Sequence, residues 1–296
     1  MRTLTLQIPP ELDGRRVKSV LQYRLQIPSS MIARIKLHPT GICLNGERCR
    51  TTDTVRAGDT LSAEVGDLPR ETGITPVRYP LEIRFEDEDL LVLEKPAGMA
   101  THGKALRGDA TVAAALAALR GTDQPFHPVT RLDRGTSGLM VAAKSGYAHE
   151  RLRRLLHTEG FVREYLALVC GAPPEHSGSV TLPLEKDPTG KNRFRTAPDG
   201  LPARTDYTLL ETRGWLSLLR LRLYTGRTHQ IRVHLSALGC PVWGDRVYGE
   251  SAPEIGRPAL HSAFLYLRQP ITGAEIELES PMPEDMEALW RFMRSK

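Results

Sequence analysis

The chain has 296 residues, 40% of them hydrophobic, which is enough for one large domain or two smaller ones with buried cores. Charged residues make up 25%, close to the globular average, which argues against wholesale disorder. No stretch approaches the roughly 20 apolar residues that span a bilayer, and the first residues lack the long apolar core of a secretory signal. We therefore expect a cytoplasmic protein with no membrane partner.

The four cysteines do not form a recognisable disulfide or metal pattern. They are Cys43, Cys49, Cys170 and Cys240, and no two of them make a Cys-x-x-Cys pair. This excludes a zinc ribbon and a thioredoxin-type motif. We expect reduced thiols, most of them buried.

The positive charge is concentrated near the N-terminus. The net charge is +5 and the pI is near 9.1. Residues 1–65 hold ten Lys/Arg against six Asp/Glu, whereas the other 231 residues hold thirty against twenty-nine. A small basic module on a near-neutral body favours a polyanionic partner, because phosphates attract clustered cations. A solvated, slightly basic surface is the alternative.

Two short helices are predicted at the start of this module. Apolar residues recur at helical spacing over 14–25, and Ser29 or Ser30 can cap a second helix containing Ile32 and Ile35. The outward positions of both helices are basic, and these residues are candidate RNA contacts: Arg15, Arg16, Lys18, Arg34 and Lys36.

A small sheet is predicted to follow the two helices. Asn45-Gly46 indicates a hairpin after the apolar residues 42–44, and a turn at 57–59 leads into a strand at 60–65. This order of elements resembles the S4-like RNA-binding domain. The resemblance predicts an S4-like RNA-binding domain over 1–65.

The remainder is predicted to be a linker at 66–80, with three prolines and two glycines, and a catalytic body at 81–296. The body alternates strands and helices, with more strands than helices and several short turns. We expect an α+β fold in which helices flank a mixed, largely antiparallel sheet. The predicted strands are 81–85, 90–94, 139–143, 165–169, 205–211, 216–223, 260–267 and 275–279, and the predicted helices are 109–120, 145–157 and 283–294.

The densest polar segment is 127–138, which lies just before an apolar strand. In it Asp133 stands between Arg131 and Arg134. Nearby cations favour an ionised carboxylate, which can act as a nucleophile or base. A structural Arg–Asp pair beside a loop is the alternative, because such pairs are common.

A second cluster covers 225–234. Thr228 can cap a helix that runs to about Leu238, which would leave Arg227 just outside the helix N-terminus, where its guanidinium suits a phosphate or carboxylate. His229 and His234 are five residues apart and do not share a helical face, which argues against a metal site. The chain also lacks a Gly-x-Gly-x-x-Gly, a Walker-type loop and a Gly-x-Ser-x-Gly elbow. We therefore expect no metal and no cofactor.

The segment 131–138, Arg-Leu-Asp-Arg-Gly-Thr-Ser-Gly, followed by Ala143-Lys144, resembles the RluA-type pseudouridine synthases. Further segments appear in the family order over 81–296. They are 94–99 (EKPAGM), 161–167 (FVREYLA), 226–234 (GRTHQIRVH), 244–249 (GDRVYG) and 259–261 (ALH). The resemblance implies the pseudouridine synthase fold and isomerisation of specific uridines in structured ribosomal or transfer RNA.

The resemblance also assigns roles to single residues. Asp133 matches the catalytic aspartate, and Tyr165 matches the tyrosine that stacks on the target base and assists removal of its C5 proton. Arg227 matches the basic partner of the aspartate, and Arg131 the arginine that fills the gap left by the extruded nucleotide. The chain departs from the family at Thr130, often His, and at His102-Gly103, often His-Pro.

Three functional hypotheses follow from the sequence. The first is the RNA-modifying enzyme, which we expect to be a monomer. The second is an RNA-binding or assembly protein with an inactive body, which the presence of Asp133, Tyr165 and Arg227 disfavours. The third is a hydrolase or metalloenzyme that uses the histidines. Whether Asp133 would attack the ribose C1′ or remove the 2′ proton stays open at this stage.

Overall fold

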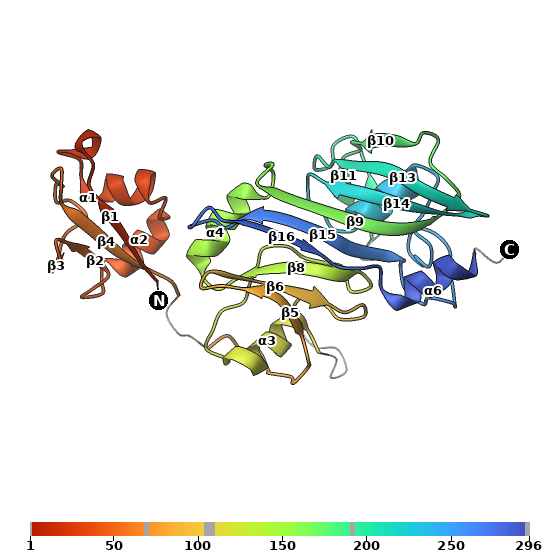
Figure 1. The fold of residues 1–296 in the computed structure, drawn as a ribbon, viewed down its shortest axis with the longest axis horizontal. Helices are drawn as coiled ribbons and strands as arrows, with labels where there is room; N and C mark the ends of the chain where they lie inside the picture. The colour runs from red at the N-terminus through yellow and green to blue at the C-terminus, as the bar shows by residue number, and fades with distance from the viewer. Residues whose placement is uncertain (1, 68–70, 104–109, 190–192, 294–296) are drawn as a thin grey trace.

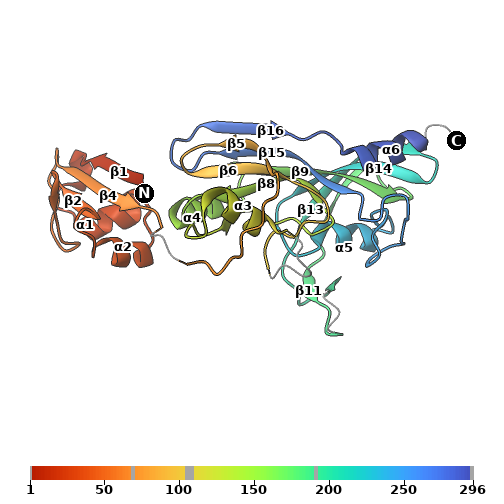
Figure 2. The ribbon, with the colours of Figure 1, turned by 90° about the horizontal axis from the view of Figure 1, so that it is seen from below.

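The computed structural model describes residues 2–67, 71–103, 110–189 and 193–293. Two sheets dominate the structure, a four-stranded sheet formed by residues before 66 and a ten-stranded sheet formed by residues after 81 (Figure 1). A third, two-stranded sheet of β11 (Leu184–Lys186) and β12 (Phe194–Thr196) projects to one side of the body (Figure 2). The predicted α+β class with a mixed, largely antiparallel sheet is confirmed.

The N-terminal sheet is antiparallel, with strand order β1-β4-β2-β3. Its strands are β1 (Arg2–Gln7), β2 (Ile42–Leu44), β3 (Glu47–Arg48) and β4 (Thr60–Val65). Asn45 and Gly46, with φ of 53° and 85°, form the predicted two-residue turn between β2 and β3. Strand β1, which was not predicted from the sequence, pairs with β4 from the far end of the module.

Helical segments cover one side of this sheet. They are η1 (Pro10–Leu12), α1 (Val17–Ser19) continuing into η2 (Val20–Arg24), and α2 (Ser29–Ile35). The predicted serine cap of the second helix is wrong, because Ser29 is already the first helical residue and Pro28 occupies the cap position. The Ser29 hydroxyl instead accepts a hydrogen bond from Gln22 at 2.5 Å.

The large sheet runs in the order β10-β13-β14-β9-β15-β8-β6-β5, with β16 beside β15 and β7 beside β8. Its strands are β5 (Glu82–Glu86), β6 (Leu90–Lys95), β7 (His127–Pro128), β8 (Ser137–Ala143), β9 (Phe161–Cys170), β10 (Ser177–Val180), β13 (Thr205–Arg213), β14 (Leu216–Leu223), β15 (Leu260–Arg268) and β16 (Glu275–Glu279). Every pairing in it is antiparallel except that of β15 with β8.

The parallel junction of β15 with β8 lies at the centre of the sheet and positions one row of residues. Ser262 of β15 is paired with Gly138 of β8 on one side and with Tyr165 of β9 on the other. Gly138 has φ of 109°, and a Cβ there would lie 2.2 Å from the Ser262 carbonyl oxygen, so only glycine fits. The two strands therefore approach closely next to the segment that contains Asp133.

Helices α3, α4 and α5 lie on one side of the large sheet (Figure 2). The body helices are α3 (Val112–Arg120), α4 (Gly146–Leu155), α5 (Gln230–Ala237) and α6 (Glu284–Phe292). The predicted Ser145 cap is confirmed, since its side chain accepts from the amide of Ala148. Residues 109 and 294, included in two predicted helices, lie outside the described residues. Among the residues described, no helix is long and apolar enough to cross a membrane.

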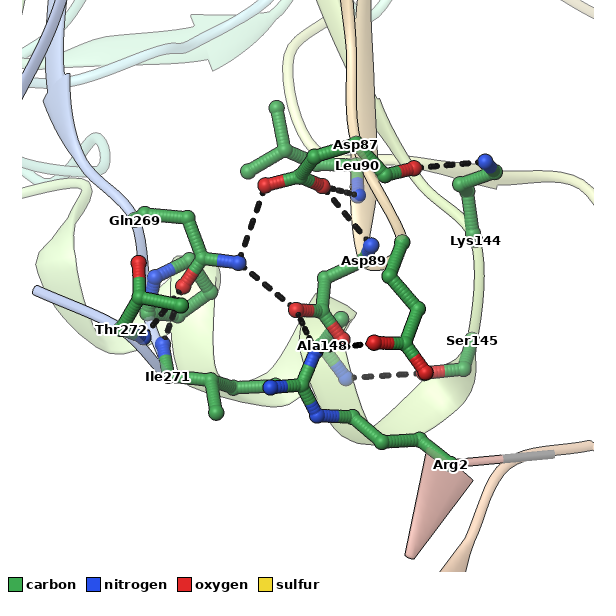
Figure 3. A network of polar contacts seen from close by, with 12 residues as sticks. Arg2, Asp87, Asp89, Leu90, Lys144, Ser145, Ala148, Gln269, Ile271 and Thr272 are labelled. Atoms are coloured by element: carbon green, nitrogen blue, oxygen red, sulfur yellow. Dashed lines mark hydrogen bonds and ion pairs between the residues drawn. The ribbon is translucent and has the colours of Figure 1, made fainter. Parts of the chain in front are cut away.

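A polar network joins the N-terminal strand to the body (Figure 3). The Arg2 guanidinium lies 2.5 Å from Asp89 and 3.0 Å from Glu88. Asp89 is 3% exposed and also accepts from Gln269 at 2.6 Å. Burial is the main cause that raises the pKa of Asp89, and the Gln269 hydrogen bond and the Arg2 charge oppose it. A second contact comes from Tyr147 of α4, which belongs to the N-terminal hydrophobic cluster.

All four cysteines are free thiols, and Cys43 and Cys240 are buried. Burial raises the pKa of Cys49 and Cys240 to about 11. These two side chains therefore stay protonated at neutral pH, as structural thiols do.

Candidate active site

Asp133 lies in the segment between β7 and β8, which is held by bonds from neighbouring loops. The Thr101 hydroxyl donates to the Leu132 carbonyl at 3.1 Å, and Arg134 Nε donates to the Gly98 carbonyl at 2.7 Å. The side chain of Asp133 keeps 25% of its surface exposed. The loop is thus fixed on both sides of a carboxylate that solvent can still reach.

The ion-pair partner of Asp133 is Arg232, whose Nη1 lies 3.0 Å from Asp133 Oδ2. His229 Nε2 is 3.8 Å from the same oxygen. The predicted pairing with Arg227 is wrong, because Arg227 Nε donates to the carbonyl of Pro202 at 3.2 Å. Arg227 still lines the same cavity as Asp133, as an exposed residue.

Arg232 is itself held by a second carboxylate, Asp245. Its Nε and Nη2 donate to the two oxygens of Asp245 at 2.6 and 2.8 Å, in a bidentate pair. Asp245 is 1% exposed and also accepts from the amide of Val247 at 3.0 Å. Burial would lower the pKa of Arg232, but the hydrogen bonds and charges of Asp245 and Asp133 raise it overall. Arg232 therefore stays cationic and fixed in orientation.

The start of α5 explains why the inward arginine is Arg232. Thr228 does not cap this helix, since the helix begins after His229, which has φ of 59°. Gln230 is the first helical residue, and its side-chain oxygen holds the preceding loop by accepting from the amide of Arg227 at 3.0 Å and from the Thr225 hydroxyl at 2.7 Å. Arg227 is left before the helix, whereas Arg232 lies one turn inside it.

A cavity of about 570 Å³ opens beside Asp133. Asp133, Tyr165, Arg131 and Arg227 all line it, so the structure brings the four predicted site residues together. Tyr165 is 4% exposed, and burial raises the pKa of its phenol while the nearby Arg163 lowers it. Arg131 is exposed at the cavity wall.

Lys95 is a fully buried cation near this site. Its ammonium donates to the carbonyls of Pro96 and Met99, both at 2.8 Å. Burial lowers the pKa of Lys95 to about 7, and the charge of Asp133 opposes that change. Lys95 thus holds the 96–99 turn against the end of β6, behind the loop of Asp133.

The histidines of the second cluster have hydrogen-bonded roles. His234 Nδ1 is 2.9 Å from the Thr205 hydroxyl, and His234 Nε2 is 2.9 Å from the Leu182 carbonyl. His229 Nδ1 is 2.9 Å from the Tyr248 hydroxyl. In the part of the chain that the structure describes, no group of three or more His, Cys, Asp or Glu could hold a metal ion.

The five basic residues predicted to contact RNA are all exposed. Four of them form no ion pair among the described residues, whereas Arg34 lies 3.8 Å from Asp67 at the boundary with the body. Asp67 also lies 2.6 Å from His127 Nε2. Arg34 is therefore partly occupied by a contact within the protein.

Comparison with known proteins identifies the family. Residues 89–237 match the family described as RNA pseudouridylate synthase. Ribosomal large subunit pseudouridine synthase D of Nitrosomonas europaea is 34% identical, over 99% of this chain and 88% of its own length. The chain belongs to the RluA-type RNA pseudouridine synthases. The Escherichia coli K12 synthase D is 35% identical over 99% of this chain and 94% of its own length.

A solved structure supports the same fold. Human RNA pseudouridylate synthase domain containing 4 has a TM-score of 0.58 and 25% identity, over 72% of this chain and 93% of that chain. Pseudouridine synthases isomerise uridine in RNA, which is redox neutral. Asp133 and Arg232 both lie within residues 89–237, the range that matches the family.

Arg232 and Asp245 were not predicted as site residues from the sequence. Both lie in segments that carried the family resemblance, 226–234 and 244–249. The available signal was that two buried residues of opposite charge need each other as partners, and these two stand in neighbouring segments of the family pattern.

Proposed function

We propose that this pseudouridine synthase acts on RNA of the large ribosomal subunit, with Asp133 as its catalytic residue. The observation that carries the proposal is the position of Asp133. Its accessible carboxylate is held 3.0 Å from Arg232 at the wall of a cavity of about 570 Å³ that Tyr165 also lines. The relatives named above support the substrate class, because their names specify the large ribosomal subunit.

The chemistry requires a fixed carboxylate beside the ribose. The N1–C1′ bond of uridine breaks, the base turns, a C5–C1′ bond forms, C5 loses its proton and N1 gains one. Arg232 holds Asp133 oriented, which lowers the entropic cost of bringing the carboxylate to the sugar. Tyr165, buried on β9, would stack on the uracil and assist the loss of the C5 proton.

The target nucleotide must leave its stack to reach the cavity. Arg131 is exposed at the cavity wall next to Asp133, where its side chain would fill the gap left in the RNA. Arg227 is exposed at the same wall, and we assign it to RNA contact rather than to the aspartate.

The first test is the variant Asp133→Asn in the full-length protein. We expect no pseudouridine formation in ribosomal RNA, with RNA binding and folding close to wild type. Asp206→Asn is a matched control, because Asp206 is 26% exposed and also pairs with an arginine, Arg204, at 2.9 Å. Full activity of Asp133→Asn would refute the catalytic assignment.

The second test concerns the substrate. Pseudouridines are mapped transcriptome-wide in cells with and without this protein. We expect sites to disappear from large-subunit ribosomal RNA when the protein is absent. Loss from transfer RNA alone would overturn the substrate class but not the reaction. Tight RNA binding by purified protein without any conversion would favour the assembly-protein hypothesis.

We further propose that the N-terminal module is an S4-like domain that docks structured RNA. Its exposed basic residues Arg15, Arg16, Lys18 and Lys36 support this proposal. Each lost phosphate contact should reduce the slope of log affinity against log salt by about 0.7 to 0.9.

The matched pair of variants for the N-terminal module uses two cations each. Arg15→Gln with Lys18→Gln should flatten the salt dependence of RNA binding. Arg268→Gln with Arg291→Gln removes two exposed arginines of the body that pair with carboxylates. We expect that second variant to keep the wild-type slope. Equal slopes for both variants would count against a docking role.

A further inference from the structure

One arginine beside the catalytic cavity, Arg163, has buried donors that find no hydrogen-bond acceptor among the residues that the structure describes. Arg163 is 7% exposed, and its Nε and Nη2 are buried without any hydrogen-bond partner in the structure. It lies two residues before Tyr165 on β9, and both side chains are on the buried face of that strand. Both also line the cavity.

The remaining nitrogen of this guanidinium faces Gly226. A Cβ placed at Gly226 would lie 3.2 Å from Arg163 Nη1, so a side chain at this position would crowd the guanidinium. Gly226 itself lines the cavity. The guanidinium is therefore buried within the protein yet adjacent to the space that the extruded nucleotide would occupy.

Burying a cation without a counter-ion is costly. The Phe161 ring, whose centroid lies 5.8 Å from Arg163 Cζ, offers a cation–π contact but no hydrogen-bond acceptor. Burial lowers the pKa of Arg163, and the Tyr165 phenol is the titratable group that opposes this change. Among the described residues, the packing around Arg163 thus supplies no carboxylate for its charge and no acceptor for Nε and Nη2.

The charges around the cavity indicate what kind of group would pair with Arg163. Its described lining has one carboxylate, that of Asp133, against five arginines: Arg131, Arg134, Arg153, Arg163 and Arg227. Such a cavity attracts an anion. Uracil and ribose are neutral, so the phosphates are the only anionic groups that an extruded uridine brings with it.

We propose that Arg163 binds the phosphodiester adjacent to the extruded uridine. The planar fork of donors suits a phosphate, and the bound phosphate would satisfy a cation that the protein leaves unpaired. Arg163 would then fix the ribose relative to Asp133 by holding the phosphate to which it is attached. This inference rests on the proposed function and adds a substrate contact to it.

The test is a double-mutant cycle of RNA affinity, in which one change is made in the protein and the other in the RNA. The probe is a ribosomal RNA hairpin containing the uridine that the enzyme converts, with a neutral methylphosphonate at the phosphate 5′ of that uridine, 3′ of it, or at a remote position. One of the two flanking substitutions should weaken wild-type binding by about 10- to 150-fold. Arg163→Met should weaken binding of the unmodified hairpin by a similar factor.

The decisive result is the combination of the two changes. Arg163→Met should bind the sensitive methylphosphonate hairpin as well as the unmodified one, since both changes remove the same contact. Arg220→Met is the matched control, because Arg220 is exposed on the other face of the sheet, between buried Leu219 and Leu221. We expect it to keep the wild-type sensitivity.

Further outcomes separate this inference from its alternatives. If the effects of Arg163→Met and the methylphosphonates multiply at both flanking positions, Arg163 does not bind phosphate. A structural role predicts a lower melting temperature for Arg163→Met, whereas loss of an unpaired buried charge predicts an equal or higher one. Arg163→Lys, which keeps the charge, should retain part of the sensitivity even if the methionine variant folds poorly.

The proposed function is checked separately, by conversion of the unmodified hairpin by wild-type protein. A multiplicative cycle with normal conversion would overturn only the Arg163 inference. Wild-type protein that converts no ribosomal RNA uridine would overturn the proposed function.

Discussion

Arg232 makes ion pairs with two carboxylates of different burial, so its structural role at Asp245 and its proposed role at Asp133 can be tested separately. Asp245 is 1% exposed and loses two hydrogen bonds of 2.6 and 2.8 Å if Arg232 is truncated. Asp133 is 25% exposed, so water can replace its lost partner. The stability cost of Arg232→Met should therefore come mostly from Asp245.

Removing one partner of a buried ion pair costs about 3–5 kcal/mol. For a domain of 150–250 residues this corresponds to a melting temperature lower by roughly 6–20 °C. Asp133 would also lose its orientation, and misplacement of a reacting group costs about 100-fold in rate. Single-turnover pseudouridine formation and thermal unfolding measure the two effects separately.

The double variant Arg232→Met with Asp245→Asn distinguishes them. The Asp245→Asn change removes the buried carboxylate charge that has no partner in the single variant, so most of the lost stability should return. Activity should stay low, because Asp133 remains unpaired. Recovery of activity together with stability would refute a direct role of Arg232 at Asp133. Wild-type stability of the single variant would refute the reasoning about Asp245.

Three further predictions test the fold around the site. Gly138→Ala should lower the free energy of unfolding by about 3 kcal/mol or prevent folding, because its Cβ would clash with β15. Gly171→Ala, which has open space around it, should lower it by only about 1 kcal/mol, and denaturant unfolding measures both. Arg2→Met should cost about 1–3 kcal/mol, because Asp89 loses a charged hydrogen bond in its buried site. Burial lowers the pKa of His261 to about 4, so folding stability should fall by up to about 3 kcal/mol as pH drops from 6.5 to 4, and His261→Gln should flatten this dependence.

The sign of the His261 effect follows from proton binding. The unfolded chain binds a proton on this histidine below its ordinary pKa, near 6.5, while the folded chain resists it until about 4. Stability is therefore complete above pH 6.5 and is lost as the pH falls toward 4. Ser137 and Ser280 contact the two ring nitrogens at 2.9 Å, and Arg257 disfavours the added charge.

Local signals predicted much of the fold because the structures they specify are themselves local. Asn45-Gly46 specifies its turn through two positive φ values, and Ser145 caps α4 through a bond to a residue three positions away. Strand β1 was missed because the partner that defines it, β4, lies almost sixty residues later in the chain. Its alternating Leu4 and Leu6 were the available signal.

The choice between Arg227 and Arg232 could not be made from periodicity. The first six residues of α5 are buried, so the helix has no polar face to indicate which side chain points inward. The position of Arg232 depends on Asp245, which approaches from a later loop, and on Gln230, whose side-chain nitrogen donates to the Arg204 carbonyl and the Thr205 hydroxyl. These contacts form only when separate segments pack together, so the helical periodicity of 230–237 does not report them.

Burial divides the arginines around Asp133 into groups with different expected functions. Arg131 and Arg227 are exposed, so RNA can displace water from them at little cost. Arg232 is buried but already forms ion pairs with two carboxylates, so it is suited to hold Asp133 in position rather than to bind RNA. Arg163 is buried and pairs with no carboxylate among the described residues, and the phosphate contact proposed above would offset the cost of that burial. The same burial that makes Arg163 unfavourable in the free protein would make its contact with a phosphate strong, because little water remains there to compete.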